Sequence, residues 1–398
     1  MNPVSDGLGS RNVDEHLVVD GLIFSVLRHG GILRLFSEAL PRVCELEPGL
    51  QVTLLATGER GNLPSHPRIA VRRLVPVEGI LRPGRLWLQA VPKLRQWVQR
   101  VALRNEPRGI WHSTYSTLLP GWRGPTAVTV YDLIGEHFKS LLHGAALRAT
   151  EQFNGMQRRA VQAADVVLCI SEATRADAVR TYGIPPERTR VVPLACNECF
   201  APEQVRSPSG RPFVLYVGSR YGYKNFRTLL RAFASWGPGH GVGLVVVGRA
   251  WSLQERREVA ALGIGDWVRV VEMCSDAELC GLYNAAGAFV YPSLCEGFGI
   301  PLLEAMACGC PVVASRIPST VEVSGECPFY FEPESVEDLV RALSEALAAG
   351  RSGERAERGF RRAREFSWDR TAEMTLAVYR ELWARERETR RVEPEGGR

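Results

Sequence analysis

Apolar, strand-like runs alternate with helical stretches along this chain, and the alternation occurs twice. In the first half, the strand candidates are residues 17–27, 51–57, 70–77, 109–114, 126–132, 165–171 and 189–195. After residues 200–212, which are rich in Pro, Ser and Gly, strands recur at 213–219, 242–248, 268–273, 288–293 and 311–315. Strands of nearly continuous Val, Ile and Leu that alternate with helices predict parallel sheets covered on both faces. We therefore predict an α/β fold of two Rossmann-like domains that face a cleft.

The length of the chain agrees with two domains, because 398 residues exceed what a single hydrophobic core usually organises. The predicted organisation is an N-terminal domain over 1–199, a linker over 200–212, a C-terminal domain over 213–375 and a final helical segment with a tail over 376–398. The glycine fingerprint of dinucleotide-binding domains follows none of the predicted strands. A nicotinamide or flavin dehydrogenase is therefore not expected.

The composition indicates a cytoplasmic protein. No apolar run approaches the roughly 18–20 residues that span a bilayer, and the first 16 residues lack the apolar core of a signal peptide. The ten cysteines are scattered, as expected of reduced thiols. Cys196 and Cys199 form a CxxC pair, but no second pair or nearby His completes a zinc site, so no metal is expected.

Residues 82–104 form a basic segment with two interpretations. Its apolar residues recur at near-helical spacing, interrupted by Pro92: Leu86, Trp87, Val91, Leu94, Val98 and Val101, with Trp97 beside them. The segment could lie on an anionic membrane surface as an amphipathic helix. It could equally pack on its own domain with a solvated basic face. Nucleic acid is not an expected partner, because the aromatic residues do not form a base-stacking platform.

The stretch at 291–315 combines a strand, a glycine corner and a helix. Pro301 suits the first helical position, which places residues 297–300 at the helix mouth, where free N–H groups and the helix dipole favour an anion. Glu296 lies just outside this mouth and Glu304 lies near the first turn. Carboxylates accept hydrogen bonds from sugar hydroxyls. The site therefore matches the ribose, diphosphate and hexose of a nucleotide sugar.

A second glycine corner carries two cations. In YVGSRYGYKNFRTLLRAF (216–233), Gly218 ends a strand, and Arg220 and Lys224 precede the helix. Two cations at this place could clamp a diphosphate and stabilise the charge that develops on a leaving nucleotide. Without the two glutamates, solvated loop cations would be the simpler interpretation.

These motifs resemble those of a known family. The stretch EGFGIPLLEAMACGCPVVAS, with seven residues between its two glutamates, resembles the signature of the retaining GT-B glycosyltransferases of family 4. YVGSRYGYKNF resembles the diphosphate clamp of that family, and VLCISEATRADAVRTYGIPPERTRVVPL resembles the segment that closes its N-terminal domain. The resemblance spans nearly the whole chain. It implies a retaining transfer from a nucleotide sugar, without a protein nucleophile and without a metal cofactor.

The resemblance also implies roles for individual residues. Glu296 would contact the transferred hexose and Glu304 the ribose, while the helices after Trp368 would cross back to the N-terminal domain. Arg220 and Lys224 would bind the diphosphate by their charges. Phe298 and Gly299 would donate backbone N–H groups to it. Gly30 and Gly31 would let the backbone of the N-terminal domain approach it closely.

One position departs from the family pattern. In VTVYDL, Tyr131 stands where the family commonly has a His, and Tyr can donate a hydrogen bond to a sugar but carries no imidazolium charge. Asp132 and Glu136 follow and could face a sugar. His112, at another strand end, could be an alternative polar group in the cleft or a buried structural residue.

The expected substrates follow from the resemblance. The YKNF form of the clamp resembles that of mannosyltransferases, so GDP-mannose is the expected donor and a UDP-hexose the alternative. The acceptor would be a glycan, a glycolipid or a lipid-linked polysaccharide intermediate at the cytoplasmic face of the membrane, or else a soluble sugar or natural product. A GT-B epimerase acting on UDP-N-acetylglucosamine shares the architecture, but the two glutamates and the SEAT segment argue against it. A non-catalytic carbohydrate-binding protein would not need the two cations and two glutamates together.

Overall fold

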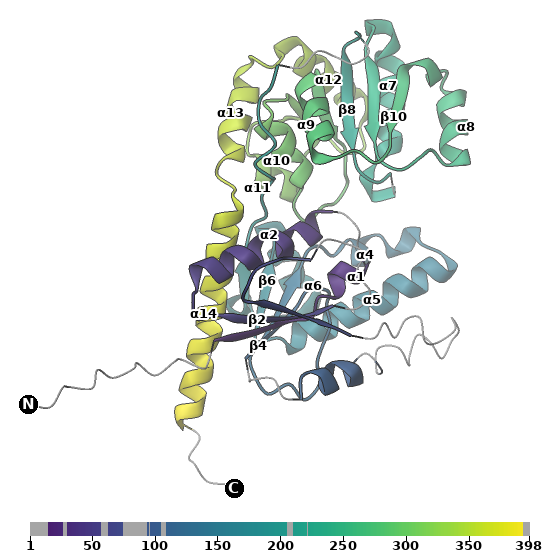
Figure 1. The fold of residues 1–398 in the computed structure, drawn as a ribbon. Coiled ribbons are helices and arrows are strands. Elements are labelled where there is room, and N and C mark those ends of the chain that lie inside the picture. The colour runs from purple at the N-terminus through teal and green to yellow at the C-terminus, as the bar shows by residue number, and fades with distance from the viewer. Residues whose placement is uncertain are drawn as a thin grey trace, which may run out of the picture.

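The chain folds around two parallel β-sheets, one in each half of the sequence (Figure 1). The structure is a computed structural model that describes residues 15–26, 30–56, 63–74, 94, 96–104, 109–204, 210–220 and 222–392. The strands are β1 (His16–Val19), β2 (Gln51–Ala56), β3 (Ile69–Arg73), β4 (Ile110–Ser113), β5 (Thr126–Val130), β6 (Val166–Cys169), β7 (Thr189–Val191), β8 (Phe213–Val217), β9 (Gly243–Val247), β10 (Val268–Val271), β11 (Ala288–Tyr291), β12 (Val312–Ser315) and β13 (Phe329–Phe331).

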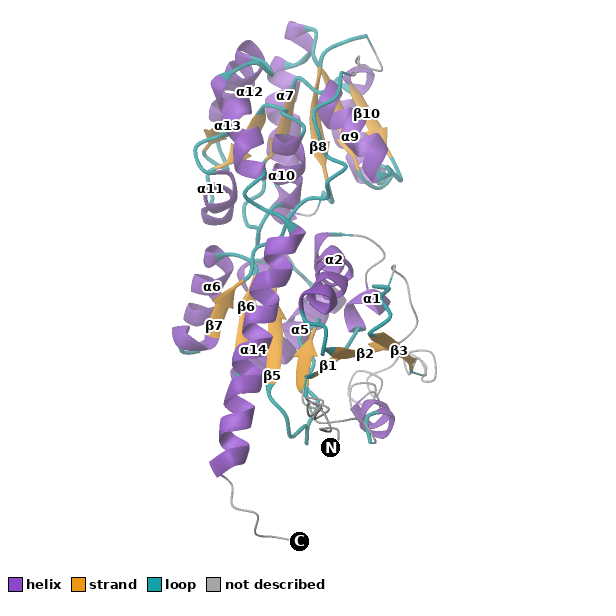
Figure 2. Ribbon diagram, turned by 60° about the vertical axis from the view of Figure 1, so that its left-hand side comes forward, coloured by secondary structure: helices purple, strands orange, loops and turns teal. Residues whose placement is uncertain are grey.

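Helices cover both faces of each sheet (Figure 2). They are α1 (Leu22–Val26), α2 (Gly31–Leu46), α4 (Ile134–His137), α5 (Gly144–Ala163), α6 (Glu172–Tyr182), α7 (Phe226–Trp236), α8 (Leu253–Ala261), α9 (Asp276–Ala285), α10 (Ile300–Ala307), α11 (Pro318–Ser324), α12 (Val336–Ala349), α13 (Glu354–Ala363) and α14 (Trp368–Val392). None of the helices that the structure describes has the length and apolar character needed to cross a bilayer.

Both sheets have the strand order of a doubly wound fold. The first runs β3-β2-β1-β4-β5-β6-β7 and the second β10-β9-β8-β11-β12-β13, and neighbouring strands pair in parallel. In each sheet the order reverses beside the first strand, between β1 and β4 and between β8 and β11. Ligands of such folds bind beyond the carboxyl ends of the strands at this reversal. The predicted fold class, two α/β domains with parallel sheets, is confirmed.

One predicted strand is wrong over half of its length. Residues 17–27 were expected to be a single strand, but β1 ends at Val19 and residues 22–26 form α1. The break occurs at Gly21, whose φ of +47° suits glycine, and a Cβ there would lie 2.4 Å from the carbonyl oxygen of Leu55. The Asp20 carboxylate then accepts a hydrogen bond from the backbone N–H of Leu22. A continuous apolar run therefore contains both a strand and a helix, which apolar character alone does not separate.

The helix at 172–182 agrees with its sequence signals in detail. Ser171 caps α6 by accepting a hydrogen bond from the backbone N–H of Thr174 at 2.9 Å, and Gly183 ends the helix in the left-handed conformation. Both signals are visible in the sequence, as a Ser directly before the helix and a Gly directly after it. The helix begins beyond the carboxyl end of β6, so its N-terminus faces the other domain.

The last helix runs from the C-terminal half back along the first half of the chain (Figure 1). It is a single helix from Trp368 to Val392 that packs against α2, so the domain boundary that we placed at 375/376 falls inside it. Tyr379 shares a hydrogen bond of 2.6 Å with Nδ1 of His112, and Arg190 forms an ion pair with Glu381. These contacts fasten α14 to the first sheet.

Candidate active site

The mouth of α10 lies at the carboxyl end of β11, where the second sheet reverses its order. The helix begins at Ile300, one position earlier than the start predicted at Pro301, and Gly299 precedes it with φ +109°. A residue with a Cβ would be strained at that angle, so glycine shapes this turn. The mouth also touches the first domain, because a Cβ on Gly31 would lie 2.5 Å from Cδ1 of Ile300. Gly30, beside it, has φ +128°.

Lys224 and Glu296 form an ion pair at the mouth. Lys224 follows β8 and Glu296 follows β11, and because these strands are neighbours, the ammonium nitrogen lies 2.6 Å from Oε1 of Glu296. Burial lowers the pKa of Lys224, but the Glu296 carboxylate raises it, and the net shift is upward. Lys224 therefore carries a positive charge at the edge of the site at neutral pH.

Arg220 is held away from Lys224. Its Nε lies 2.7 Å from Oε1 of Glu255, and its guanidinium stacks over Trp251 at 4.7 Å from the ring centroid. Within the part of the chain that the structure describes, its buried Nη1 has no hydrogen-bond partner, and a Cβ on Gly248 would lie 3.2 Å from it. The two predicted clamp cations thus follow the same strand and bind different carboxylates. The unpaired Nη1 lies beside Gly248 at the end of β9.

Glu255 shows how strongly Arg220 is held. Burial raises the pKa of this carboxyl, but hydrogen bonds from Arg220 and from the backbone N–H of Ser252 lower it to about 2. Glu255 remains ionised over the whole physiological range and fixes the direction of the guanidinium.

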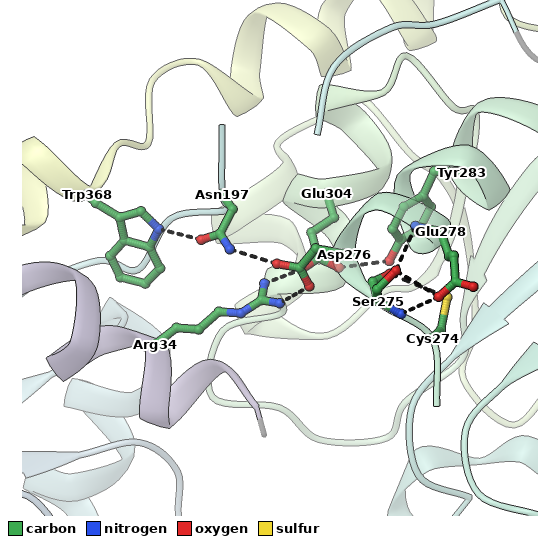
Figure 3. Close-up of polar contacts among 9 residues, drawn as sticks. All are labelled: Arg34, Asn197, Cys274, Ser275, Asp276, Glu278, Tyr283, Glu304 and Trp368. Atoms are coloured by element: carbon green, nitrogen blue, oxygen red, sulfur yellow. Dashed lines mark hydrogen bonds and ion pairs between the residues drawn. The ribbon is translucent and has the colours of Figure 1, made fainter. Parts of the chain in front are cut away.

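Glu304 is buried and bound to residues of both domains (Figure 3). Its Oε1 accepts a hydrogen bond from Nη1 of Arg34 at 3.0 Å, and its Oε2 accepts one from the Tyr283 hydroxyl at 3.1 Å. Burial raises the pKa of Glu304 to about 7, although Arg34 acts in the opposite direction. Arg34 comes from α2 of the first domain, and its other nitrogen, Nη2, contacts Asp276.

The two residues that follow β5, Tyr131 and Asp132, point to different surroundings. Tyr131 is buried, and its hydroxyl donates a hydrogen bond of 2.8 Å to the carbonyl of Thr114, so its one proton is already engaged. Asp132 lies beside a cleft of about 250 Å³ between the domains, which Glu296 and Asp177 also line. Burial and then the Glu296 charge raise the pKa of Asp132, opposed by a hydrogen bond from the N–H of Ile134. The Asp132 carboxylate, and not the Tyr131 hydroxyl, is the group that this loop presents to the cleft.

Two contacts bring the domains together beside the site. The carbonyl of Gly297 accepts hydrogen bonds from the hydroxyls of Ser171 at 2.6 Å and Thr174 at 3.1 Å. On the neighbouring helix α11, the Glu322 carboxylate accepts hydrogen bonds from the first two backbone N–H groups of α6, at 2.7 and 2.9 Å. The second domain therefore caps a helix of the first, at the positive end of its dipole.

Sequence reasoning missed the residues that act between the domains. No local sequence pattern marks the three residues that act here, because their partners lie 150 to 270 residues away in sequence: Arg34, Asp276 and Glu322. The one available signal was the position of Arg34 just after the Gly-Gly corner. His112 is a buried structural residue, bonded to Tyr379 and Thr129, and burial lowers its pKa to about 3.

Metal-binding geometry is not found at this site. In the residues with described positions, no group of three or more His, Cys, Asp or Glu side chains could hold an ion.

Two family descriptions match adjacent parts of the chain. Residues 199–365 match "Glycosyl transferases group 1", and residues 46–198 match "Glycosyltransferase Family 4". Together these segments cover most of the chain and include the helix mouth, both cations and both glutamates.

Characterised relatives agree with this match. The chain is 31% identical over 236 residues to the O-antigen chain mannosyltransferase B of Escherichia coli, which covers 56% of this chain and 62% of the relative. It is 34% identical over 240 residues to the MMP alpha-(1->4)-mannosyltransferase of Mycolicibacterium hassiacum, which covers 58% of each. The matched segments thus span about three fifths of the length of these relatives.

The solved structure of the sucrose-phosphate synthase of Thermosynechococcus elongatus superimposes with a TM-score of 0.74 and 22% identity, and covers 94% of this chain and all of that one. At this identity the likeness concerns the fold, which is the two-domain GT-B architecture.

Proposed function

This chain belongs to the group 1 glycosyltransferases of family 4. We propose that it transfers a hexose, with mannose favoured, from a nucleotide diphosphate sugar to a glycan, glycolipid or polysaccharide intermediate. The observation that supports the donor class best is the Lys224–Glu296 pair of 2.6 Å at the mouth of α10. It combines a cation for phosphate with a carboxylate for sugar hydroxyls at the end of neighbouring strands. The printed names of the two relatives support mannose.

In the proposed reaction, the anomeric configuration of the hexose is retained. The bond between the anomeric carbon and the phosphate oxygen breaks, and a bond from the acceptor oxygen forms on the same face. The acceptor's proton passes to the departing phosphate, so no protein nucleophile is required. Lys224, with its ammonium charge, and the N-terminus of α10 stabilise the negative charge on the leaving diphosphate. Arg220 contributes through Nη1, while Glu255 keeps its guanidinium in place.

The carboxylates position the sugars. Glu296 accepts hydrogen bonds from hexose hydroxyls once Lys224 turns toward phosphate, and Glu304 accepts them from the ribose. Asp132 faces the cleft of about 250 Å³ from the other domain and is the group that we assign to the hexose or the acceptor. The close contact of the domains around this site would exclude water, which otherwise hydrolyses the donor.

A contact with anionic lipid would deliver a lipid-linked acceptor at the cytoplasmic face of the membrane. Of the basic segment 82–104, residues 94 and 96–104 are described, and Trp87 lies outside the described residues. Trp97 and Val101, one helical turn apart, are 61% and 55% exposed, while Gln99 and Leu103 are buried. One face of this segment therefore packs on the domain, and the other presents an aromatic and an aliphatic side chain to the surroundings. That arrangement supports membrane contact.

Thermal shift and calorimetry with GDP, UDP, ADP and their sugar conjugates test the donor assignment. We expect the strongest shift with GDP and GDP-mannose, and a loss of about 10- to 150-fold in affinity for Lys224→Ala, since a hydrogen bond to a charged group contributes about 1.5–3 kcal/mol. Lys139→Ala is the matched control, because the Lys139 side chain is 53% exposed and, among the described residues, forms its ion pair with Glu136. Preference for UDP would reassign the donor to a UDP-hexose, and no shift with any nucleotide would favour a non-catalytic carbohydrate-binding protein. NMR of the product's anomeric proton then tests retention.

Co-sedimentation with vesicles that contain anionic lipid tests the membrane contact. The double change Trp97→Ser with Val101→Ser should reduce binding, and Leu253→Ser, which removes a 78% exposed side chain from the other domain, should not. Equal binding by the two variants would contradict the proposed surface.

A further inference from the structure

Arg34 connects the two domains at the carboxylate assigned to the ribose. It lies in the first turn of α2, and its two terminal nitrogens contact different carboxylates of the second domain, Glu304 on α10 and Asp276 on α9. Both partners are fixed by their own elements. A capping box between Ser275 and Glu278 starts α9 and places Asp276 in its first turn, and Tyr283 of the same helix binds Glu304.

The contacts of Arg34 extend to the crossover helix (Figure 3). The free oxygen of Asp276 accepts a hydrogen bond of 2.8 Å from the side-chain amide of Asn197, and the amide oxygen of Asn197 accepts one of 3.2 Å from the indole N–H of Trp368. Trp368 is the first residue of α14. This series of polar contacts thus connects five parts of the molecule: α2, the end of the first domain, α9, α10 and α14. These parts change their relative position when two such domains open or close.

The geometry leaves Glu304 able to bind a diol. Arg34 occupies one lone pair of Oε1 and Tyr283 one lone pair of Oε2, at 3.0 and 3.1 Å. Each carboxylate oxygen can accept a further hydrogen bond, so two neighbouring hydroxyls can still be bound. Because both oxygens are already held, the plane of the carboxylate is set before a ligand arrives.

The charge of Glu304 also depends on its neighbours. The titratable and charged groups that interact with it are Arg34 from α2, Asp276 and Tyr283 from α9, and Cys196 and Cys199 from the segment after β7. Arg34 is the cation of this set. Its guanidinium opposes the upward shift of the Glu304 pKa that burial causes.

We propose that Arg34 is a positioning residue, which orients Glu304 and stabilises its ionised form for the ribose hydroxyls of the donor, so that recognition of the ribose requires the closed arrangement of the domains. This inference rests on the proposed function, in which Glu304 binds the ribose. It adds a residue of the N-terminal domain to the ribose subsite, in which Glu304 and its partner Tyr283 come from the C-terminal domain. Loss of Arg34 is expected to impair ribose recognition in particular, and not diphosphate binding in general.

Comparison of a nucleoside diphosphate with its 2′,3′-dideoxy analogue tests this specificity. The dissociation constant of each is measured by calorimetry between pH 5.5 and 9 for the wild type, Arg34→Met, Arg34→Lys and Arg42→Met. Arg42 is the matched control, because it lies on the same helix and forms two ion pairs, with Glu38 and Asp369, away from the site.

The wild type should bind the ribonucleotide at least about tenfold more tightly than the dideoxy analogue, and Arg34→Met should lose most of this difference while its affinity for the analogue changes little. The pH midpoint of ribonucleotide binding should rise in Arg34→Met and lie between the two values in Arg34→Lys. Arg42→Met should behave as the wild type.

Failure of this inference is distinguishable from failure of the proposed function. If the wild type binds no nucleoside diphosphate, the proposed function fails. If the wild type discriminates between the two nucleotides and Arg34→Met discriminates equally, with the same pH midpoint, Arg34 has no positioning role. Equal losses for both nucleotides in Arg34→Met would also overturn the inference, since they would indicate a merely structural contact. If Arg34→Met does not fold, Arg34→Lys decides by the same comparison.

Discussion

The substitution Gly297→Ala tests whether catalysis requires the contact between the two domains. The carbonyl of Gly297 binds Ser171 and Thr174 of the first domain, and a Cβ on Gly297 would lie 1.8 Å from the carbonyl oxygen of Tyr131. Contacts of a Cβ below 3.0 Å essentially do not occur, and here the obstacle is backbone, which cannot rotate away. The loop after β11 and the loop after β5 must therefore separate by about 1.2 Å or more.

That separation is large enough to break both hydroxyl hydrogen bonds. Hydrogen bonds of 2.6 and 3.1 Å would lengthen beyond the range in which they contribute to stability. At about 1 kcal/mol each, their loss lowers the equilibrium constant for domain closure by about 30-fold. The substitution leaves the hydrophobic core of each domain unchanged, so we expect a fall in kcat/KM of this size with only a small change in melting temperature.

The assay is release of nucleoside diphosphate in the presence of donor and acceptor, with small-angle scattering as an independent measure of domain separation. Gly281→Ala is the control, because a Cβ at Gly281 on α9 meets no atom within 4 Å. A variant Gly297→Ala that keeps kcat/KM within about twofold of the wild type would refute the reasoning, and so would an equal fall in Gly281→Ala.

Three further predictions follow from buried or interdomain groups. The pKa of Glu304 is raised from 4.5 to about 7 in the folded state. The unfolding free energy of the wild type, relative to that of Glu304→Gln, should therefore fall as the pH rises between these two values and level off above them. Denaturant titrations at several pH values measure this difference. Tyr379→Phe leaves a nitrogen of buried His112 without its partner and should cost about 1–3 kcal/mol in unfolding free energy, with kcat nearly unchanged. Glu322→Ala removes the acceptor for two N–H groups of α6 and should weaken closure by about 0.5–2 kcal/mol, visible as a raised donor KM; an unchanged KM would show that this cap does not support closure.

The predicted site residues are arranged by the topology of the second sheet. Lys224 and Glu296 meet because β8 and β11 are neighbours, and parallel strands end at the same edge. Arg220 follows the same strand as Lys224, yet it is directed to Glu255, whose position the sequence did not connect with the clamp. Their roles in catalysis stay predictions until the nucleotide experiments are done.

The sequence by itself determined the features that depend on residues close together in the chain. The alternation of strands and helices, the Ser171 cap and Gly183 stop of α6, and the glycine corner before α10 depend on hydrogen bonds and backbone angles over three or four residues. The division of residues 17–27 into β1 and α1 was not visible, because a buried helix and a buried strand are equally apolar.

Only the tertiary structure decided which groups meet across the domains. Arg34 and Glu304 are 270 residues apart, and neither sits in a pattern that names the other as its partner. Their contact depends on how α2, α9 and α10 pack, and therefore on the shape of many buried side chains at once. Because of the same packing, the Tyr131 hydroxyl donates its hydrogen bond to the carbonyl of Thr114, and Asp132 lines the cleft. Helix caps, helix stops and glycine turns are determined by residues close together in the sequence, whereas the partners of a buried charge are determined by the complete fold.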